Sequence, residues 1–201
     1  MSDTRPPIYF VRHGETEWNR LGIIQGWTDI PLNDTGHLQA ASVARAFLAH
    51  PEVSTYSRFL VSPMERTRQT LGHIAEALAL PQNHMEIAPP LKELGFGIWE
   101  GKPFWELKAS PLYPADPETR YAWRPEGGES YADGQERLSE WLNGITEPTV
   151  IVSHGALGRC LIGMLTNMSI RDMMNIRMPQ GRFCQIHKGV AEWFDGTSLP
   201  A

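Results

Sequence analysis

Three short apolar segments limit the fold of this chain more than any other feature of its sequence. They cover residues 8–11, 58–61 and 149–152, and each is built mainly from β-branched, aromatic and aliphatic residues, as buried strands are. Segments with the apolar spacing of helices fill the chain between and after them. Strands that alternate with helices predict an α/β fold, a three-layer α/β/α sandwich with a mostly parallel central sheet.

The spacing of apolar residues predicts four helices. The first covers residues 35–49 and is expected to bury a stripe of four apolar side chains, namely Leu38, Ala41, Ala44 and Leu48. The second covers residues 63–79, and its expected stripe consists of Leu71, Ile74, Ala75 and Leu78. Two further helices are expected around residues 138–142 and 157–165, the second of them directly after a predicted strand.

Two local signals add detail to this plan. Ser62 is a candidate N-cap for the second helix, with Pro63 at the first helical position and Glu65 closing a capping box. Near the other end of the chain, strand-like runs over 183–187 and 190–194 flank a two-residue turn, which predicts a hairpin.

Length and composition restrict the class of protein. With 201 residues the chain has room for one full-sized domain, so we expect residues 1–201 to form a single domain. A net charge of −5 argues against general nucleic-acid binding and against anionic membrane surfaces. The first residues lack a signal-peptide pattern, and no apolar run is long enough to span a membrane. Two cysteines, Cys160 and Cys184, fit a reducing environment, so a cytoplasmic location is expected.

Residues 96–131 break the alternation of strands and helices. The segment holds eight aromatic residues and five prolines, which is unusual for a sheet element. Long irregular segments in compact domains often cover a binding site, so this segment is expected to act as a lid-like insertion. The alternative is an irregular satellite core without a role at the site.

Polar residues follow all three predicted strands. Arg12 and His13 follow the first strand, Arg66 lies in the helix after the second, and His154 follows the third. Because the carboxyl ends of parallel strands meet at one edge of the sheet, these side chains are expected to converge there. Each alone is more often structural than functional, but together with helix N-termini they predict an anion site.

The residues at these positions resemble the motifs of a known family. Arg12-His13-Gly14-Glu15 and the residues up to Asn19 are similar to the signature of the histidine phosphatase superfamily, also called phosphoglycerate mutase-like. Further segments of the chain resemble that family's later motifs in order. They are Gln25–Leu32, Ser62–Thr70, Leu91–Gly101, Gly127–Ser130 and Ser153–Gly155.

The resemblance implies catalysis through a phosphohistidine on His13. Arg12 and Arg66 would clamp the phosphoryl oxygens and disfavour the charged form of the His13 ring. His154 would donate a further hydrogen bond, and Glu93 would protonate the leaving group and then activate water. Residues expected to contact the substrate by the same match are Asn19, Gln25, Gly26 and Gly155. Glu15 is expected only to orient the site and Arg68 to be structural.

Neither a metal nor a cofactor is expected. The histidines and cysteines have no metal-ligand spacing, and no phosphate-binding loop for a nucleotide is present. The predicted partner is therefore a small-molecule phosphate ester. A monomer and a homodimer are both compatible with the sequence.

Family resemblance leaves several functions open. The leading one is a metal-independent phosphatase for small phosphate monoesters. The alternatives are a cofactor-dependent phosphoglycerate mutase, an α-ribazole-phosphate-type phosphatase, and a protein that binds phosphorylated ligands without turnover. Against a mutase, the segment 96–131 has only scattered basic residues and no adjacent arginine pair. Its tryptophans, Trp99, Trp105 and Trp123, are expected to stack on a ring-bearing leaving group, which favours aryl phosphates.

Overall fold

Six strands form one sheet in the part of the chain that the computed structural model describes, which is residues 5–51, 53, 57–81 and 84–195. The strand order is β3-β2-β4-β1-β5-β6, with parallel pairing from β3 to β1 and antiparallel pairing of β5 with β1 and β6. The strands are β1 (Ile8–Arg12), β2 (Arg58–Val61), β3 (Met85–Ile87), β4 (Thr149–Ser153), β5 (Arg182–His187) and β6 (Val190–Asp195). Residues 1–4, where the sequence shows no signal-peptide pattern, lie outside the described residues.

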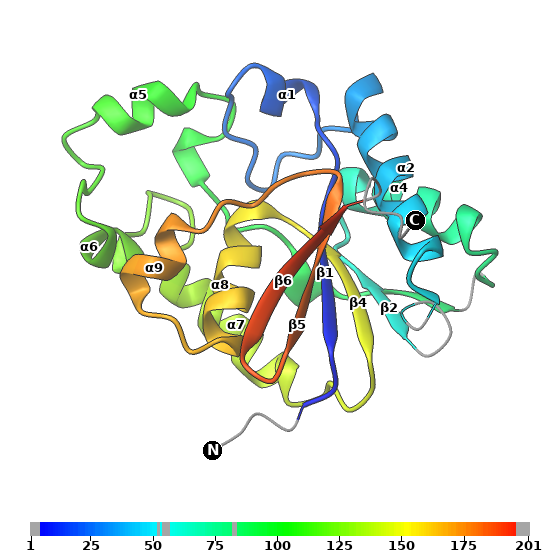
Figure 1. Ribbon diagram of the computed structural model, residues 1–201. Helices are drawn as coiled ribbons and strands as arrows, with labels where there is room; N and C mark the ends of the chain where they lie inside the picture. The colour runs from blue at the N-terminus through cyan, green and yellow to red at the C-terminus, as the bar shows by residue number, and fades with distance from the viewer. Residues whose placement is uncertain (1–4, 52, 54–56, 82–83, 196–201) are drawn as a thin grey trace.

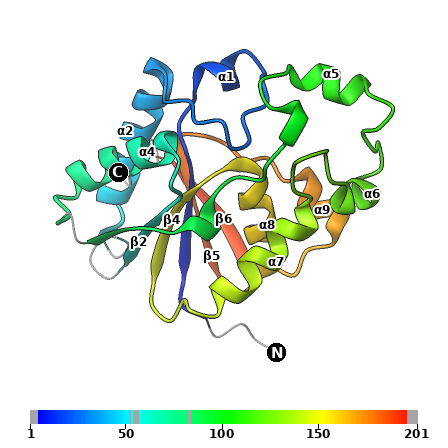
Figure 2. The same cartoon turned by 180° about the vertical axis from the view of Figure 1, so that it is seen from behind.

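Helices cover both faces of this sheet (Figures 1 and 2). The longer ones are α2 (Asp34–Leu48), α4 (Glu65–Ala77), α7 (Tyr131–Leu142) and α8 (Gly155–Leu165). The shorter ones are α1 (Glu17–Arg20), α5 (Phe104–Ala109), α6 (Pro117–Ala122), α9 (Ile170–Asn175) and the 3₁₀ turns η2 (Pro89–Leu91) and η3 (Gly97–Trp99). No helix of the described residues is both long and apolar enough to cross a membrane.

The alternation of side chains along the strands produces two hydrophobic cores. Tyr9 and Val11 of β1 point to one face and pack in a core with α2 and α4. Ile8 and Phe10 point to the other face and pack with α7 and α8. Strands buried on both faces read as continuous apolar runs, which is the pattern that the sequence shows. The predicted three-layer α/β/α sandwich with a mostly parallel sheet is confirmed.

The buried face of α2 differs from the expected one. Leu38 and Leu48 are 72% and 55% exposed, so the predicted stripe through them is wrong. The buried stripe is instead Ala40, Val43 and Phe47, together with Ala44. Both stripes have helical spacing, and the prediction followed the one that contains leucines because leucine is the more apolar residue. Small Ala40 and Ala44 are buried because α2 packs closely against α4 and the sheet.

The start of α4 also differs from the prediction. Ser62 does not cap the helix: Met64 is the N-cap residue and makes no side-chain cap hydrogen bond. The backbone N–H of Glu65 donates instead to the carboxylate of Asp29, at 2.8 and 3.1 Å from its two oxygens. The Ser62 hydroxyl lies 2.7 Å from Nε2 of His154. The same hydroxyl accepts from the Met64 N–H at 3.4 Å, so it binds the turn before α4 and the buried imidazole of His154 rather than the first turn of the helix.

The hairpin of β5 and β6 is confirmed, whereas β3 was not predicted. β3 has only three residues and lies at the edge of the sheet, where its side chains are half-buried or exposed. Its residues, Met85, Glu86 and Ile87, alternate between apolar and polar, but three residues are too few for periodicity to identify a strand.

Residues 96–131 contain η3, α5 and α6 and lie above the carboxyl ends of the parallel strands. In Figures 1 and 2, α5 lies beside α1 along this edge of the molecule. Backbone hydrogen bonds join the two regions: Ile24 N–H donates to the Lys102 carbonyl and Phe104 N–H to the Gly22 carbonyl, at 2.9 and 2.8 Å. The segment is therefore attached to the loop that follows α1.

Candidate active site

The carboxyl ends of β1, β2 and β4 bring the predicted residues together. Arg12 and Ser153 are paired in register across β1 and β4. Beyond the strands, the His13 N–H donates to the Ser153 carbonyl and the Ser62 N–H to the Val152 carbonyl, both at 3.0 Å. The three strand ends are thus held side by side by the main chain, as the parallel topology predicts.

The hydrogen bonds of His13 fix which of its ring nitrogens is free. Nδ1 lies 2.7 Å from the carbonyl oxygen of Gly14. A carbonyl oxygen only accepts, so Nδ1 carries the proton and Nε2 of the neutral ring keeps its lone pair. The His13 side chain is almost fully buried and lines a cavity of about 260 Å³. We name it the histidine cavity.

The surroundings keep the His13 ring neutral. Burial, followed by the positive charges of Arg66 and Arg12, lowers its pKa well below the usual 6.5. His154 is also completely buried, and burial together with the charge of Arg66 lowers its pKa well below the usual value. Both rings are therefore uncharged at neutral pH.

Arg66 is fully buried, yet part of its guanidinium is unpaired. Two of its terminal N–H groups donate to backbone carbonyls, Nη1 to Thr28 at 3.0 Å and Nη2 to Gly26 at 2.9 Å. Asp29 lies 3.7 Å from Nη1, so the charge is only loosely paired. Nε has no hydrogen-bond partner among the described residues.

Two further buried nitrogens beside His13 have no partner among the described residues, Nε of Arg12 and Nδ1 of His154. Nδ1 of His154 is a donor when the Ser62 hydroxyl, which accepts from the Met64 N–H, gives its own hydrogen to Nε2. Arg12 is anchored by a 2.7 Å hydrogen bond from Nη1 to the Met178 carbonyl. The rings of His154 and His13 have centroids 5.2 Å apart. Buried donors are rarely left unpaired, and several of them around one imidazole nitrogen fit an anionic ligand.

Glu93 lies at the edge of the same cavity. Its Oε1 accepts from the N–H groups of Leu94 and Leu157, both at 3.0 Å, and its Oε2 accepts from Ala156 at 3.1 Å. Trp27 holds the Glu93 backbone, because its Nε1–H donates to the Glu93 carbonyl at 2.8 Å. Oε2 has one donor where Oε1 has two, so Oε2 is the oxygen with room for a proton.

The residues expected to contact substrate lie in the same region. Asn19, Gln25 and Gly26 line the histidine cavity. Oδ1 of Asn19 accepts from the N–H and hydroxyl of Thr16, which leaves its amide N–H₂ as the group for a ligand. Gly155 lies at the neighbouring cavity instead, next to Arg12. The structure thus brings all nine predicted residues to one edge of the sheet.

A second cavity of about 200 Å³ adjoins the first, and we name it the aromatic cavity. Both are lined by Arg12, Glu93, Phe96 and Phe104. Trp123 lines the aromatic cavity, but Trp99 and Trp105 do not, and Trp105 is 68% exposed. The expectation that all three tryptophans face the leaving group is therefore wrong for Trp99 and Trp105.

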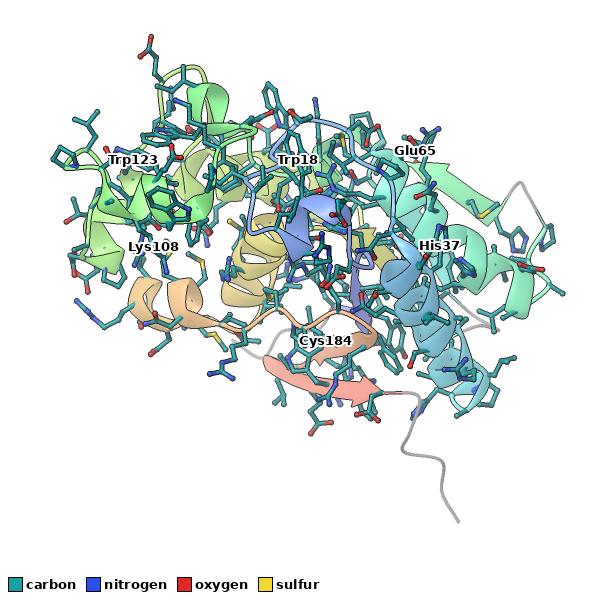
Figure 3. The ribbon with its side chains drawn as sticks, turned by 90° about the horizontal axis from the view of Figure 1, so that it is seen from above. Trp18, His37, Glu65, Lys108, Trp123 and Cys184 are labelled. Carbon is teal, nitrogen blue, oxygen red and sulfur yellow. The ribbon has the colours of Figure 1, made fainter. Side chains whose placement is uncertain are left out.

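The view from above shows how the segment 96–131 lies relative to the rest (Figure 3). Trp123 and Lys108 lie on one side of the molecule, His37 and Glu65 lie on the opposite side with α2 and α4, and Trp18 lies between them. The helices α5 and α6 therefore extend outward from the site rather than over α2 and α4.

Three residues at the site were not predicted from the sequence. Gln180 donates from Nε2 to the His13 carbonyl at 3.1 Å and to Oδ1 of Asn19 at 3.2 Å. Glu100 accepts from the N–H groups of Trp27 and Phe96, at 2.9 and 3.0 Å, and so joins two loops of the site. Arg159 lines the aromatic cavity from α8. Glu100 lies in Leu91–Gly101, one of the segments that resemble the family's motifs, whereas no such segment contains Gln180 or Arg159.

The donor groups at this site suit an anion rather than a metal ion. Among the described residues, no cluster of three or more histidine, cysteine or acidic side chains could hold a metal. The groups that gather instead are guanidinium and imidazole N–H donors, whose geometry matches the oxygens of a phosphate.

Comparisons with known proteins agree with this geometry. The model of the histidine phosphatase superfamily (branch 1) matches residues 8–193. An adenosylcobalamin/alpha-ribazole phosphatase of Salmonella typhimurium is 30% identical over 186 residues, which cover 87% of this chain and 86% of that protein. The solved structure of the alpha-ribazole phosphatase from Shigella flexneri is 25% identical, with a TM-score of 0.76 over 94% of this chain and 95% of that chain.

A relative with another name is almost as similar. A Yersinia pestis protein named "Probable phosphoglycerate mutase GpmB" is 29% identical over 203 residues, which cover 92% of this chain and 86% of that protein. The family model spans nearly the whole chain, and the fold and strand-end residues agree with it. The chain therefore belongs to the histidine phosphatase superfamily, branch 1.

Proposed function

We propose that this protein is a metal-independent phosphatase that hydrolyses small-molecule phosphate monoesters through a phosphohistidine intermediate on His13. One observation carries the proposal: the free Nε2 of a neutral, buried imidazole lies among buried N–H donors that have no partner in the described part of the chain. A nucleophile surrounded by unpaired donors suits attack on a phosphorus atom whose oxygens these donors bind.

In the first step, Nε2 of His13 attacks phosphorus and the bond to the ester oxygen breaks. Arg12 and Arg66 bind the phosphoryl oxygens with the N–H groups that remain unpaired, and His154 donates from Nδ1. The Gly14 carbonyl holds the proton on Nδ1 and stabilises the positive charge that develops on the ring. The Ser62 hydroxyl keeps His154 oriented through Nε2.

Glu93 serves as acid and then as base. Oε2 gives its proton to the departing alkoxide, and the resulting carboxylate accepts a proton from the water that attacks the phosphohistidine. The three backbone N–H donors stabilise the carboxylate, which suits the second step.

Asn19, Gln25, Gly26 and Gly155 complete the proposed binding site. The proposal treats the chain as a single domain, 1–201, in which residues 96–131 act as the lid-like insertion and line the space for the leaving group. It also includes a cytoplasmic location and no nucleic-acid partner. Light scattering on the purified protein distinguishes a monomer from a homodimer.

The intermediate can be tested by partitioning. Hydrolysis of several esters in the presence of methanol is expected to give one constant ratio of methyl phosphate to inorganic phosphate, because every ester passes through the same phosphohistidine. Rapid quenching with labelled ester is expected to trap an acid-labile phosphoenzyme. A product ratio that varies with the leaving group contradicts a common intermediate, and an acid-stable phosphoenzyme contradicts histidine as its carrier.

The mutase alternative shares this intermediate and rests on the Yersinia pestis relative. The two functions differ in the acceptor, which is water for a phosphatase and a phosphoglycerate hydroxyl for a mutase. With 3-phosphoglycerate and 2,3-bisphosphoglycerate, we expect inorganic phosphate and no 2-phosphoglycerate. Interconversion of the phosphoglycerates faster than phosphate release would favour the mutase.

A further inference from the structure

Two guanidinium groups line the aromatic cavity beyond the catalytic residues. Arg159 comes from α8, and Arg120 comes from α6 in the segment 96–131. They are 39 positions apart in the sequence (159 − 120), so no adjacent basic pair marked them. They face a space whose other walls include Phe104, Tyr113 and Trp123.

The charge of Arg159 is not neutralised by a neighbour. Its Nε donates to the Ile176 carbonyl at 3.0 Å and its Nη1 to the hydroxyl oxygen of Tyr131 at 3.3 Å, and both acceptors are neutral. Burial raises the pKa of Tyr131 to about 12, so this hydroxyl stays protonated. No carboxylate lies within ion-pair distance of Arg159 in the described ranges.

Arg120 likewise has no carboxylate partner among the described residues. Its Nη1 donates to the Tyr113 hydroxyl at 3.0 Å, and its guanidinium carbon lies 5.3 Å from the centre of the Tyr113 ring. Its Nε is buried and has no hydrogen-bond partner in the part of the chain that is described. Nearby Arg171 forms ion pairs with Asp116 and Glu118, so the acidic residues of α6 and its cap serve another arginine.

The two carboxylates of the aromatic cavity already have partners. Glu129 pairs with Arg137 at 3.1 Å and also accepts from the Gly95 N–H. Glu93 accepts three backbone N–H groups. Besides Arg12, which binds the phosphoryl group, Arg120 and Arg159 are the cationic groups of this cavity, and neither has a carboxylate within ion-pair distance among the described residues. Charges without counterions in a half-enclosed, aromatic-walled space attract an anionic ligand.

Resting on the proposed phosphatase function, we infer that the leaving group of the preferred ester carries a second anionic group, a carboxylate or a phosphate, which Arg120 and Arg159 bind. The first phosphoryl group occupies the histidine cavity, and the body of the leaving group extends past Glu93 into the aromatic cavity. This assigns Arg120 and Arg159 as specificity-determining residues. It also changes the expectation from plain aryl phosphates to esters that combine an apolar body with a charge.

Matched pairs of esters test this assignment. 3-Phosphoglycerate and glycerol 3-phosphate differ only in a carboxylate against a hydroxymethyl group. A longer pair is 4-(carboxymethyl)phenyl phosphate and 4-(2-hydroxyethyl)phenyl phosphate, and propane-1,3-diol bisphosphate against its monophosphate tests a second phosphate. At least one pair is expected to show kcat/KM about tenfold or more in favour of the charged member. The pair with the largest ratio of kcat/KM shows whether the second anionic group is a carboxylate or a phosphate.

Variants then locate the preference. Arg120→Gln and Arg159→Gln are each expected to lower the ratio of charged to neutral ester at least threefold, mainly through KM. Arg124→Gln is the matched control, because Arg124 lies in the same segment, pairs with Asp133 on the surface and does not line the cavity. Its ratio should equal that of the wild type. Arg159 also holds α8 to the chain around Ile176, so Arg120→Gln decides the question if Arg159→Gln unfolds.

The outcomes separate the two proposals. Wild-type hydrolysis of both members at equal kcat/KM in every pair would overturn the second anion site and leave the phosphatase standing. A preference that survives in both arginine variants would overturn the assignment of these residues. If the wild type hydrolyses no ester of any pair, the proposed function fails, and the inference fails with it.

Discussion

The histidine cavity and the aromatic cavity adjoin each other but are built differently. The histidine cavity is lined by Arg12 and His13 at the end of β1, by Arg66 of α4 and by the loop after α1. Arg66, and His154 beside His13, are completely buried and are held by the main chain and by Ser62. The aromatic cavity is formed largely by half-buried side chains of α5, α6 and the loops around them. Its arginines are held by tyrosine hydroxyls and a single carbonyl.

This difference separates chemistry from recognition. Groups fixed by the sheet can keep donors and nucleophile in place for any phosphate ester, which is the condition for electrostatic stabilisation of a transition state. Groups on short helices can change without disturbing the sheet. Substitutions in the histidine cavity should therefore lower kcat for all esters, and substitutions in the aromatic cavity should change KM for particular ones.

The largest effect is expected from the nucleophile. His13→Ala should lower kcat at least about 10⁴-fold for every ester, because no other group can form the intermediate. Steady-state rates with a phenyl phosphate and an alkyl phosphate measure it. His84→Ala, which removes an exposed histidine that lines neither cavity, should retain wild-type rates. A His13→Ala protein with wild-type turnover would show that the histidine cavity is not the catalytic one.

Glu93 stands between the two cavities, so its effect should depend on the leaving group. Glu93→Gln should lower kcat/KM about 10²- to 10³-fold for alkyl esters, whose alkoxides need a proton to depart. For p-nitrophenyl phosphate, whose leaving group is already stable as an anion, the loss should be below about tenfold in the phosphorylation step. Burst kinetics isolate that step. Equal losses for both esters would remove Glu93 from the role of acid.

Parallel topology is a local rule, and it grouped the strand-end residues of the site from the sequence alone, whereas Asn19, Gln25, Gly26 and Glu93 came from the family resemblance. The strands β1, β2 and β4 are visible apolar runs, and the residues after these parallel runs must lie at the same edge of the sheet. His13, Arg66 and His154 could thus be grouped without knowing any side-chain contact. The exchange of the Ser62 hydroxyl from a helix cap to His154 could not be foreseen, because it depends on which buried group lies opposite.

The aromatic cavity was harder to predict because its walls come from distant parts of the chain without periodic patterns. Arg159, which lines it from α8, has the spacing of an ordinary helix residue. Gln180, which was missed for the same reason, contacts His13 of the histidine cavity from a position 167 residues away. Trp99, Trp105 and Trp123 looked equivalent in the sequence. Only the packing of α5 and α6 decides that Trp123 faces the cavity while Trp105 faces solvent.

The tight packing of the histidine cavity can be tested at Gly14. A Cβ atom on Gly14 would lie 2.3 Å from the Gly36 carbonyl oxygen, a backbone atom that cannot turn away. Gly14→Ala should lower the free energy of unfolding by about 2–3 kcal/mol. Gly72→Ala, on an exposed face of α4 with open space around it, should raise it by about 0.5–1 kcal/mol. Urea denaturation measures both. Equal stability of the two variants would contradict the close approach.

The aromatic cavity should respond more weakly. Trp123→Ala is expected to raise KM for phenyl phosphate about three- to tenfold, since a stacking contact contributes about 0.5–1.5 kcal/mol. Trp105→Ala should change KM less than twofold, because this side chain is mostly exposed and does not line either cavity. If both variants behave alike, the segment does not recognise the leaving group through Trp123.

In the histidine cavity, the His13 ring is expected not to titrate near neutral pH. Because burial and the charges of Arg66 and Arg12 lower the pKa of His13, its ring should stay neutral from about pH 8 down to pH 6. The ¹⁵N NMR signals of the ring, assigned with His13→Asn, should not move over this range and should show the proton on Nδ1. A midpoint near the usual 6.5 would mean that the cavity is open to solvent.

The same lowered pKa values have a consequence for stability, and its sign follows from linkage. Below about pH 6.5 the unfolded chain binds protons at His13 and His154, while the folded chain does not. The contribution of these rings to the free energy of unfolding is therefore constant above that pH and decreases as the pH falls below it, by up to about 1.4 kcal/mol per pH unit for each ring. Urea titrations of wild type and His154→Asn at about pH 7.5 and pH 5.5 measure this, and the variant should lose less stability between the two pH values. An equal loss in both proteins would mean that His154 takes up a proton in the folded state. The donors around Nε2 of His13 would then differ from those that distinguish the histidine cavity from the aromatic cavity.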